Sequence, residues 1–278
     1  MAWYVTSDAH GHLRPLDRVL ARISPGADDT VVVLGDMVDR GPDPLGVIKL
    51  VRSLPNARVL MGNHERMMLD ALLSEGDLEL DTWAMNGGYT TATGLDALEK
   101  EAFSELVDWV VNLPLFMVAE TAERPYILVH AGIDALAARG YLATAGVACS
   151  DGRGAADASV SQLLDMLACQ DPMDLLWIRG QFWGEPTGLV GADGRGPVVI
   201  AGHTPSVALS MYAGQEGVGV SPEGKGTITP LGACPETGWV ADRIDIDCAA
   251  AGGSRTGRIG VMRLDDGATW YEAIEQDE

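Results

Sequence analysis

The chain has 278 residues, of which 47% are hydrophobic and 21% charged, and this composition is typical of a globular protein rather than a disordered one. Its 40 acidic and 19 basic residues give a net charge of −21. A field of this sign repels nucleic acids and anionic membranes, so we expect neither as a partner. A binding site for an anion on this chain must be made locally positive by metal ions or arginines.

The cysteines and the first residues indicate the cytoplasm. No two of the four cysteines have C-x-x-C spacing, and a chain of this length needs no disulfide scaffold, so we expect free thiols in a reducing compartment. The N-terminus lacks the basic segment and apolar run of a signal peptide. No apolar run reaches the ~18 residues of a membrane-spanning helix.

Residues 1–73 alternate between the patterns of strands and helices. Short apolar or β-branched runs predict strands, and apolar residues three and four apart predict helices. In chain order, the expected elements are a strand at 3–7, a helix at 13–23, a strand at 30–34, a helix at 45–54, a strand at 58–61 and a helix at 65–73. This alternation predicts a mostly parallel sheet covered by helices, and ligands of such sheets bind beyond the carboxyl ends of the strands.

The remaining residues predict a more β-rich layer, a second sheet packed on the first. The expected elements are a helix at 96–113, paired strands at 115–119 and 126–129, a loop and then a helix around 160–168 within 134–170, a strand at 198–201, a long irregular loop at 213–238, an antiparallel pair at 243–248 and 258–264, and a turn at 265–267. We see no linker that divides the chain, so the fold class we expect is α/β with a single domain over residues 1–278.

Polar side chains follow the first two predicted strands where they end. Asp8 and His10 lie two residues apart on an extended segment, so both side chains point the same way and can reach one cation. The carboxylate of Asp36 has two oxygens and is able to bridge two cations. Taken alone, each motif also fits a turn that binds nothing.

Asn63 and His64 follow the third strand. An amide oxygen is an acceptable ligand for a hard cation. The adjacent His64 side chain points to the other side of the chain, which suits a proton donor better than a ligand of the same ion. The alternative is an ordinary turn before a helix that begins at Glu65.

All five histidines of the chain lie at strand-to-loop junctions with glycine close by. A lone His130 or His203 is more often structural than a metal ligand, but random placement would put some histidines inside helices. The whole set therefore indicates a site. Three aspartates, one asparagine and four histidines are enough to hold two divalent cations side by side and leave one histidine for proton transfer.

Five motifs occur in a fixed order: Asp-x-His-Gly at 8–11, Gly-Asp-x-x-Asp-Arg-Gly at 35–41, Gly-Asn-His-Glu at 62–65, His-Ala-Gly at 130–132 and Gly-His-Thr at 202–204. This order resembles the phosphoprotein phosphatase family of metallophosphoesterases, in particular its bacterial serine/threonine branch. The resemblance implies a two-sheet β-sandwich flanked by helices, in the layer order α/β/β/α.

The resemblance also implies the metal ligands. The first metal would be held by Asp8, His10 and Asp36, and the second by Asp36, Asn63, His130 and His203. Two divalent metal ions are thus the implied cofactors. Mixed nitrogen and oxygen ligands suit Mn²⁺, which we expect, as well as Fe or Zn²⁺.

The remaining roles follow from the same resemblance. His64 would be the general acid, oriented by Asp39, which we expect to raise its pKa. The substrate phosphate would be bound by Arg40, Arg179 and Asn63. Trp83 and 86–88 resemble a segment that faces the substrate. His12 departs from the commonest family form, and we expect it at the surface or behind the site.

The implied reaction is hydrolysis of phosphoserine or phosphothreonine, or of phosphotyrosine, in a phosphorylated protein or peptide by a hydroxide that bridges two metals. Hydrolases of diadenosine tetraphosphate or related nucleotides share the metal motifs and are the alternative. They resemble Gly-Asn-His-Asp at the third motif and usually lack the aspartate before the arginine, whereas this chain has Glu65 and Asp39. An inactive relative that only binds is a third alternative, but every metal position is filled.

Overall fold

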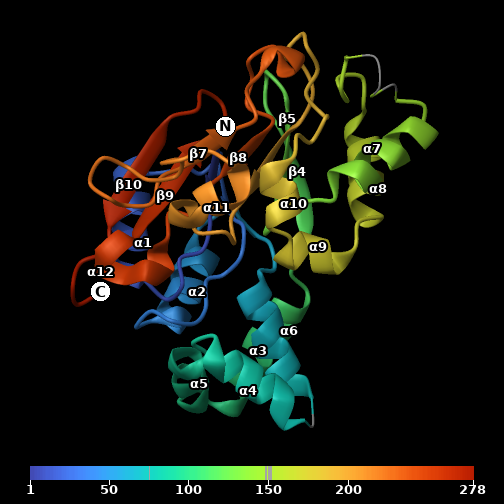
Figure 1. The fold of residues 1–278 in the computed structure, drawn as a ribbon. Helices are drawn as coiled ribbons and strands as arrows, with labels where there is room; N and C mark the ends of the chain where they lie inside the picture. Colours follow the sequence, from blue (N-terminus) through green and yellow to red (C-terminus); the bar gives the residue numbers. More distant parts are fainter. Residues whose placement is uncertain (75, 148, 150–151) are drawn as a thin grey trace.

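Two five-stranded sheets pack face to face in the computed structural model, which describes residues 1–74, 76–147, 149 and 152–278 (Figure 1). Apolar side chains of both sheets meet between them, with Val5 and Leu60 from the first sheet against Leu128 and Ile200 from the second, all fully buried. Burial on both faces explains why these strands read as continuous apolar runs rather than as alternating ones. The expected α/β sandwich is confirmed.

The first sheet has the strand order β10-β9-β1-β2-β3. Its strands are β1 (Trp3–Thr6), β2 (Thr30–Val33), β3 (Ala57–Val59), β9 (Arg258–Arg263) and β10 (Thr269–Ala273). Strands β1, β2 and β3 are parallel, and β9 runs antiparallel to both β1 and β10. The three parallel strands therefore present their carboxyl ends at the same edge.

The second sheet has the strand order β4-β5-β6-β8-β7. Its strands are β4 (Phe116–Glu120), β5 (Pro125–Val129), β6 (Val198–Ala201), β7 (Thr229–Leu231) and β8 (Arg243–Asp245). The β5, β6 and β8 strands are parallel, while β4 and β7 are antiparallel to their neighbours. The expected pairing of 115–119 with 126–129 is confirmed as β4 with β5.

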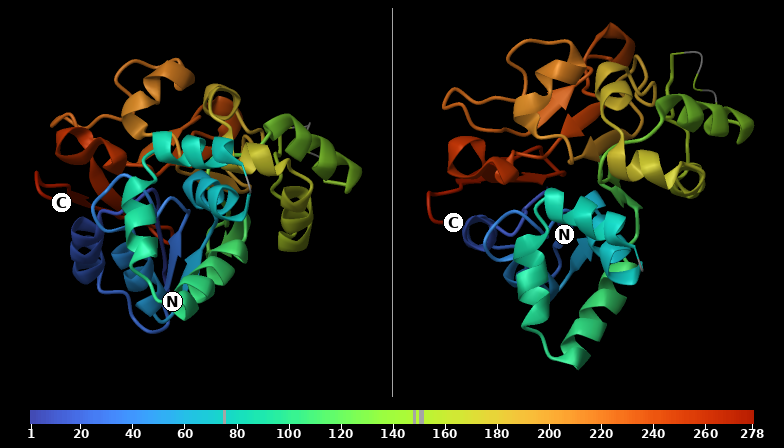
Figure 2. Two further views of the ribbon diagram at one scale, coloured as in Figure 1. Left: turned by 90° about the horizontal axis from the view of Figure 1, so that it is seen from below. Right: turned by 60° about the horizontal axis from the view of Figure 1, so that its bottom comes forward.

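The helices that precede β4 pack on the outer side of the first sheet, and Figure 2 shows those coloured cyan to green grouped together. They are α1 (Leu13–Ile23), α2 (Pro44–Ser53), α3 (Asn63–Leu73), α4 (Asp77–Met85), α5 (Tyr89–Asp96) and α6 (Lys100–Val111). Helix α2 has proline at its first position and Asp43 as its N-cap, whose side chain accepts from Gly46 N–H at 2.8 Å. The buried residues Leu16, Val19 and Leu20 form the apolar side of α1.

The outer side of the second sheet carries shorter helices. These are α7 (Ala135–Thr144), α8 (Val160–Ala168), α9 (Pro172–Trp177) and α10 (Gly180–Gly184), with α11 (Ser210–Ala213) and α12 (Gly253–Thr256) in later connections. The 3₁₀ turns are Ser206–Ala208, Pro235–Thr237 and Ala250–Gly252. Helix α8 begins with a capping box, in which Ser159 and Gln162 satisfy each other's backbone N–H groups.

One expected pairing is wrong. Residues 243–248 and 258–264 do not pair with each other, because β8 joins the second sheet beside β6 and β9 joins the first between β1 and β10. Alternation of apolar and polar residues marks a strand but carries no information about its partner. The turn expected at 265–267 is present.

Three expected boundaries are also corrected. The helix expected at 96–113 is the shorter α6, which begins at Lys100 and ends at Val111, because Asp96 ends the preceding α5. The loop part of 134–170 contains α7, whose N-cap Asp134 accepts from two backbone N–H groups. The irregular loop at 213–238 contains β7, an edge strand able to include Pro230 because an edge residue needs no second ladder bond.

Within the described residues, Cys169, Cys234 and Cys248 are free thiols, as expected. None of the described helices has the length and apolar character needed to cross a bilayer. The cytoplasmic location and the single domain stay predictions.

Candidate metal centre and active site

The predicted site residues converge at the carboxyl ends of parallel strands from both sheets. Asp8 and His10 follow β1, Asp36 follows β2, and Asn63 comes just after β3 as the first residue of α3. His130 follows β5 and His203 follows β6. All six side chains are at least 96% buried, so the structure brings together every residue that was expected to hold a metal.

The backbone of these loops is unusual. Nine non-glycine residues in the described chain have positive φ, and six of them are predicted site residues: Asp8, His10, Asp36, Asp39, Arg40 and His203. The left-handed region disfavours L-residues, and such conformations persist only where the surroundings enforce them. Because most of these residues lie at the site, we infer that the backbone of the loops adopts this conformation in order to place the site side chains.

His10 presents one ring nitrogen to the acidic residues. Its Nδ1 lies 3.0 Å from the carbonyl oxygen of Val38, which can only accept, so Nδ1 carries the proton. The Nε2 lone pair then faces Asp36 Oδ2 at 3.6 Å and Asp8 Oδ1 at 4.0 Å. His10, Asp36 and His64 form one group whose nitrogen and oxygen atoms are close enough to share a cation.

A second group of this kind contains Asp36, His130 and His203. His130 Nδ1 donates to Leu34 O at 2.8 Å, so its Nε2 lone pair is directed at Asn63 Oδ1, 2.9 Å away. His203 Nδ1 lies 2.9 Å from the same oxygen, and Asp36 Oδ1 lies 3.5 Å from His130 Nε2. Asp36 belongs to both groups, as expected of a bridging ligand.

One buried atom shows that this donor set fits cations. Asp8 Oδ1 has no hydrogen-bond partner among the described residues, and a buried polar atom without a partner is costly. Burial, followed by the Asp8 charge, raises the pKa of Asp36 well above its usual range, and burial lowers the pKa of His130 to about 4. Divalent cations would stabilise the ionised carboxylate and the neutral imidazole together.

Asp39 and His64 form a hydrogen-bonded pair beside the first group. His64 Nδ1 lies 2.6 Å from Asp39 Oδ2, and the fully buried Asp39 carboxylate also accepts from Trp83 Nε1 at 3.0 Å and from Thr91 Oγ1 at 2.6 Å. Trp83 is 2% exposed. It therefore holds Asp39 from behind, and the expectation that Trp83 faces the substrate is wrong.

Asp39 raises the pKa of His64, as expected, but the net shift of that pKa is downward. Burial lowers the pKa of His64, and the hydrogen bond to Asp39 acts against this effect without reversing it. Asp39 thus makes the protonated form of His64 easier to populate than burial alone would allow. The carboxylate fixes Nδ1 as the protonated nitrogen of the neutral ring and leaves Nε2 on the side of the site.

Arg40 is exposed and reaches over the first group. Its backbone N–H donates to Gly87 O at 3.0 Å and its Nε donates to Asn86 O at 3.4 Å, so residues 86–88 hold the arginine. Its Nη1 and Nη2 atoms lie 3.0 Å from His10 Nε2 and 2.8 Å from His64 Nε2. A guanidinium in this position is able to contact an anion bound at the site.

Arg179 lies beside the second group, as the N-cap residue of α10. Its Nη1 donates to Thr204 Oγ1 at 3.3 Å, which places the guanidinium beside His203. The preceding Trp177 ring meets the His203 ring edge-on, with centroids 6.0 Å apart. The two arginines supply the local positive charge that a chain of net charge −21 needs for an anionic ligand.

Glu65 has a larger part than its place in the third motif indicated. Its fully buried carboxylate accepts from the backbone N–H groups of Asp36 (2.8 Å), Met37 (2.8 Å) and Gly62 (3.0 Å), and so joins the loops after β2 and β3. Burial raises its pKa to about 7, against the effect of these donors. The feature of the sequence that could have indicated this role is a glutamate at the start of an apolar helix.

Sequence reasoning missed three further buried residues near the site. Ser7 Oγ donates to Asp8 Oδ2, which also accepts from His203 N–H at 3.0 Å. Asp245 and Asp247, at the end of β8, are almost fully buried, and their pKa values are raised well above the usual range by burial. Asp245 and Asp247 alternate with isoleucine at the end of a strand. This pattern could have indicated a place near the site, as the position of Asp8 after its strand did.

His12 lies apart from the other four histidines. It is 5% exposed, and its Nδ1 lies 2.9 Å from the carbonyl oxygen of Glu278. Its expected place at the surface is therefore wrong, and it is not part of either cluster.

Replacing Glu65 with glutamine should loosen both loops. The amide NH₂ would face a backbone N–H that now donates to a carboxylate oxygen, so we expect the free energy of unfolding to fall by about 1–3 kcal/mol and metal affinity to fall with it. Urea unfolding and metal analysis measure both. The matched control is Glu105→Gln on the exposed face of α6, which should change stability by no more than about 0.5 kcal/mol. Equal effects of the two substitutions would contradict the anchoring role.

Comparisons with known proteins agree with this geometry. Residues 1–224 match the family described as calcineurin-like phosphoesterase. The symmetrical bis(5'-nucleosyl)-tetraphosphatase of Erwinia tasmaniensis is 33% identical over 136 residues, which are 48% of this chain and 45% of that protein. Serine/threonine-protein phosphatase 1 of Salmonella typhimurium is 35% identical over 132 residues, 46% of this chain and 57% of that protein. The matched segment thus spans about half the length of these curated relatives.

Solved structures share the whole fold at low sequence identity. A putative diadenosine tetraphosphatase has a TM-score of 0.56 at 17% identity and covers 99% of this chain and 94% of its own. A protein serine/threonine phosphatase from Saccharomyces cerevisiae has a TM-score of 0.51 at 16% identity, covering 100% and 81%. The family match, the two-sheet fold and the paired His/Asp clusters lead to one conclusion: the chain belongs to the calcineurin-like phosphoesterases, a family whose fold implies a dinuclear centre of divalent metal ions.

Proposed function

We propose that the protein is a phosphomonoesterase that removes phosphate from phosphoserine and phosphothreonine in proteins, with phosphotyrosine as a further substrate. The observation that carries the proposal is the 2.6 Å contact between His64 Nδ1 and Asp39 Oδ2 at the edge of the metal site. An oriented imidazole of this kind is a general acid for a leaving oxygen.

The donor set divides as the family resemblance implies. In this proposal Asp8, His10 and Asp36 hold one cation, and Asp36, Asn63, His130 and His203 hold the other. Mn²⁺ is the metal we propose, with Fe and Zn²⁺ also suited to mixed nitrogen and oxygen ligands. When bound, the two ions activate a water molecule and neutralise phosphate charge.

The protein's own groups supply the remaining steps. Arg40, beside the first group, and Arg179, beside the second, bind the phosphate oxygens by charge-assisted hydrogen bonds, with Asn63 contributing its amide. His64, protonated at Nε2, donates that proton to the leaving oxygen while Asp39 holds the ring through Nδ1. The neutral ring then regains a proton from solvent.

The leaving group decides between the two substrate classes. A serine or threonine alkoxide is strongly basic and leaves only if it is protonated, so a general acid accelerates its departure. A nucleoside phosphate leaves as a much weaker base and gains little from such a group. A fully buried carboxylate with three side-chain donors, devoted to orienting one histidine, therefore supports the phosphomonoester.

Cleavage of symmetrical dinucleoside tetraphosphates is the second candidate, because relatives with that name match 48% of the chain. A panel of phosphoserine peptide, p-nitrophenyl phosphate and diadenosine tetraphosphate, each with Mn²⁺ and with a chelator, separates the two. We expect the largest metal-dependent kcat/KM for the phosphopeptide. A larger value for diadenosine tetraphosphate would overturn the proposal.

Asp36→Asn should remove the bridge between the two ions. An amide has one oxygen and no charge, so metal analysis should find fewer than the two ions per chain that the wild type binds. The exposed Asp96→Asn on α5 is the matched control and should bind as wild type. An unchanged metal content in Asp36→Asn would count against the bridging role.

His64→Asn should lower kcat on a phosphoserine peptide by roughly 10²–10⁴-fold, while the metal content stays unchanged. The loss on p-nitrophenyl phosphate should be much smaller, because nitrophenolate leaves without a proton. Loss of metal in this variant would instead make His64 a ligand, as its place beside His10 and Asp36 also permits.

Asp39→Asn should change the pH dependence of kcat. Asp39 favours the charged form of His64, so its removal lowers the pKa of His64 further below the usual value. Because the protonated form is the active one, the alkaline limb of the kcat profile should move to lower pH for the phosphopeptide. The same profile with p-nitrophenyl phosphate is the control and should not move; a shift of equal size for both substrates would refute the role.

A further inference from the structure

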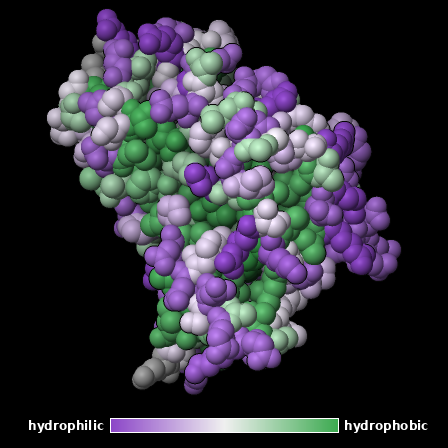
Figure 3. Space-filling view, turned by 180° about the vertical axis from the view of Figure 1, so that it is seen from behind, coloured by the Kyte–Doolittle hydropathy of each residue, from purple (hydrophilic) through white to green (hydrophobic). Residues whose placement is uncertain are grey.

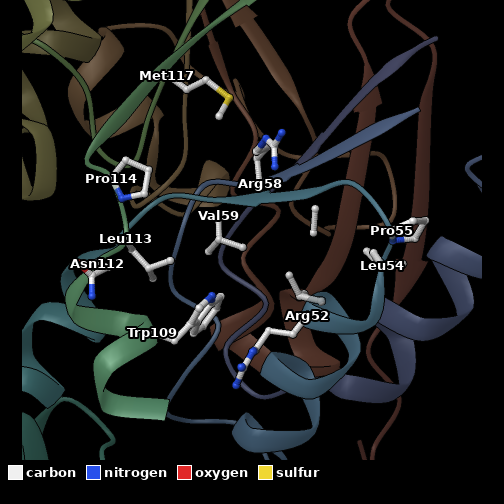
Figure 4. Close-up of a pocket in the computed structure, with 12 residues that line it drawn as sticks. Arg52, Leu54, Pro55, Arg58, Val59, Trp109, Asn112, Leu113, Pro114 and Met117 are labelled. Atoms are coloured by element: carbon white, nitrogen blue, oxygen red, sulfur yellow. The ribbon is translucent and has the colours of Figure 1, made fainter. Parts of the chain in front are cut away.

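A pocket of about 430 Å³ lies on the flank of the first sheet, away from the metal site. We call it the β3 pocket. Figure 4 shows its floor and walls: Val59 at the centre, Trp109, Leu113 and Pro114 on one side, Leu54 and Pro55 on the other. On the face opposite to that of Figure 1, apolar surface reaches the exterior between polar groups (Figure 3). None of the lining residues belongs to the metal site.

The pocket contains an unpaired strand edge. Strand β3 ends the first sheet and pairs with β2 alone. Val31 N–H donates to Asn56 O at 3.3 Å, and Leu60 N–H donates to Val33 O at 2.9 Å. The backbone N–H and C=O groups of even-numbered residues in and beside β3 therefore point toward β2. The backbone groups of Ala57 and Val59 therefore point outward, into the pocket that both residues line. Just beyond, Met61 N–H donates to Pro114 O at 2.9 Å, which closes the edge at that end.

Two exposed arginines flank this edge, and no acidic residue lines the pocket. Arg58 lies on β3 itself, and Arg52 lies at the end of α2 with its guanidinium 5.2 Å from the Trp109 ring centroid. Neither forms an ion pair with any residue that the structure describes. Other arginines are paired, such as Arg18 with Glu272 and Arg263 with Asp266. On a chain of net charge −21, two unpaired cations beside an open strand edge are a marked local exception.

We propose that the β3 pocket binds an extended, acidic peptide segment of a partner protein. The segment adds a strand to the sheet edge, with its backbone bonded to Ala57 and Val59. Alternate side chains of an added strand point to opposite faces, so apolar ones on the Val59 face enter the pocket against Leu113 while acidic ones on the other face reach Arg58. Arg52, at the rim of the pocket over the Trp109 ring, attracts the acidic segment by its charge. Charge complementarity thus selects the partner, and the free edge selects the extended conformation.

The neighbouring pocket of about 480 Å³ between α2 and α6 does not have this character. It shares Arg52 and contains Lys49, but Glu105 lines it as well, and no strand edge opens into it. A small anion is the other ligand that two arginines attract. Such an anion would interact with the two arginines alone and would form no bonds with the backbone of β3. Binding of a small anion and binding of a peptide can therefore be distinguished by experiment.

The probe is a fluorescein-labelled heptapeptide, Glu-Val-Asp-Val-Glu-Val-Asp, titrated with the Mn²⁺-loaded full chain and followed by polarisation. Two control peptides have lysine in place of each acidic residue, or N-methyl groups on alternate residues that remove one edge of N–H donors. We expect binding of the acidic peptide only. Binding that excess inorganic phosphate abolishes would place the peptide in the metal site and overturn the proposal.

Variants test the two elements of the pocket separately. Arg52→Glu with Arg58→Glu should weaken the peptide by roughly tenfold or more, whereas Arg14→Glu with Arg195→Glu, the same change in net charge on exposed positions elsewhere, should not. Ala57→Pro removes one outward N–H and should weaken binding, while Ala57→Val keeps it and should not. Hydrolysis of p-nitrophenyl phosphate should be unchanged in all four proteins.

Other outcomes contradict the proposal directly. Equal binding of the lysine peptide, or no difference between the two double variants, would remove the charge argument. Binding that depends on the arginines but not on Ala57→Pro, together with equal binding of pyrophosphate, would make the pocket an anion site rather than a strand edge that binds peptide.

Discussion

The structure depends on a cluster of buried carboxylates and imidazoles whose charges and lone pairs are not fully compensated by other groups of the protein. Asp8, Asp36, His130 and His203 are each at least 96% buried, and several of their ligand atoms face one another within 4 Å. Isolated charges in such a place cost many kcal/mol, so a chain keeps them only where ions or specific partners compensate. Cations held between these side chains would provide that compensation, and Asp36 is the residue that both groups share.

The same constraint explains the local backbone. Bringing five loops to one point requires left-handed residues and close backbone approaches that ordinary loops avoid. A Cβ at Gly202 would lie 2.2 Å from Asp8 Oδ2, and a Cβ at Gly62 would lie 2.2 Å from Asp36 Oδ1, so both positions need glycine. Glu65 compensates part of the strain by binding the backbone of the β2 and β3 loops at once. The strained backbone of these loops thus lowers the stability of the fold but holds the expected metal-ligand side chains in position.

The sequence predicted the α/β sandwich and the convergence of the expected metal-site residues, because both depend on local patterns. An apolar run that ends in Asp, Asn or His is visible in the chain, and parallel strands bring such ends together. Partners that are distant in sequence were not predictable. The alternation at 243–248 and 258–264 marked two strands but not their separate sheets, and Trp83 carried no sign that it would support Asp39 instead of facing the substrate. The pKa of His64 depends on burial, which only the packed structure defines.

The most direct test of the account is anomalous diffraction from crystals of the Mn²⁺-loaded protein. We predict two manganese peaks about 3.5–4 Å apart, with the Asp36 carboxylate between them and His64 bound to neither. A single peak, two peaks that do not share Asp36, or a manganese bond to His64 would contradict it.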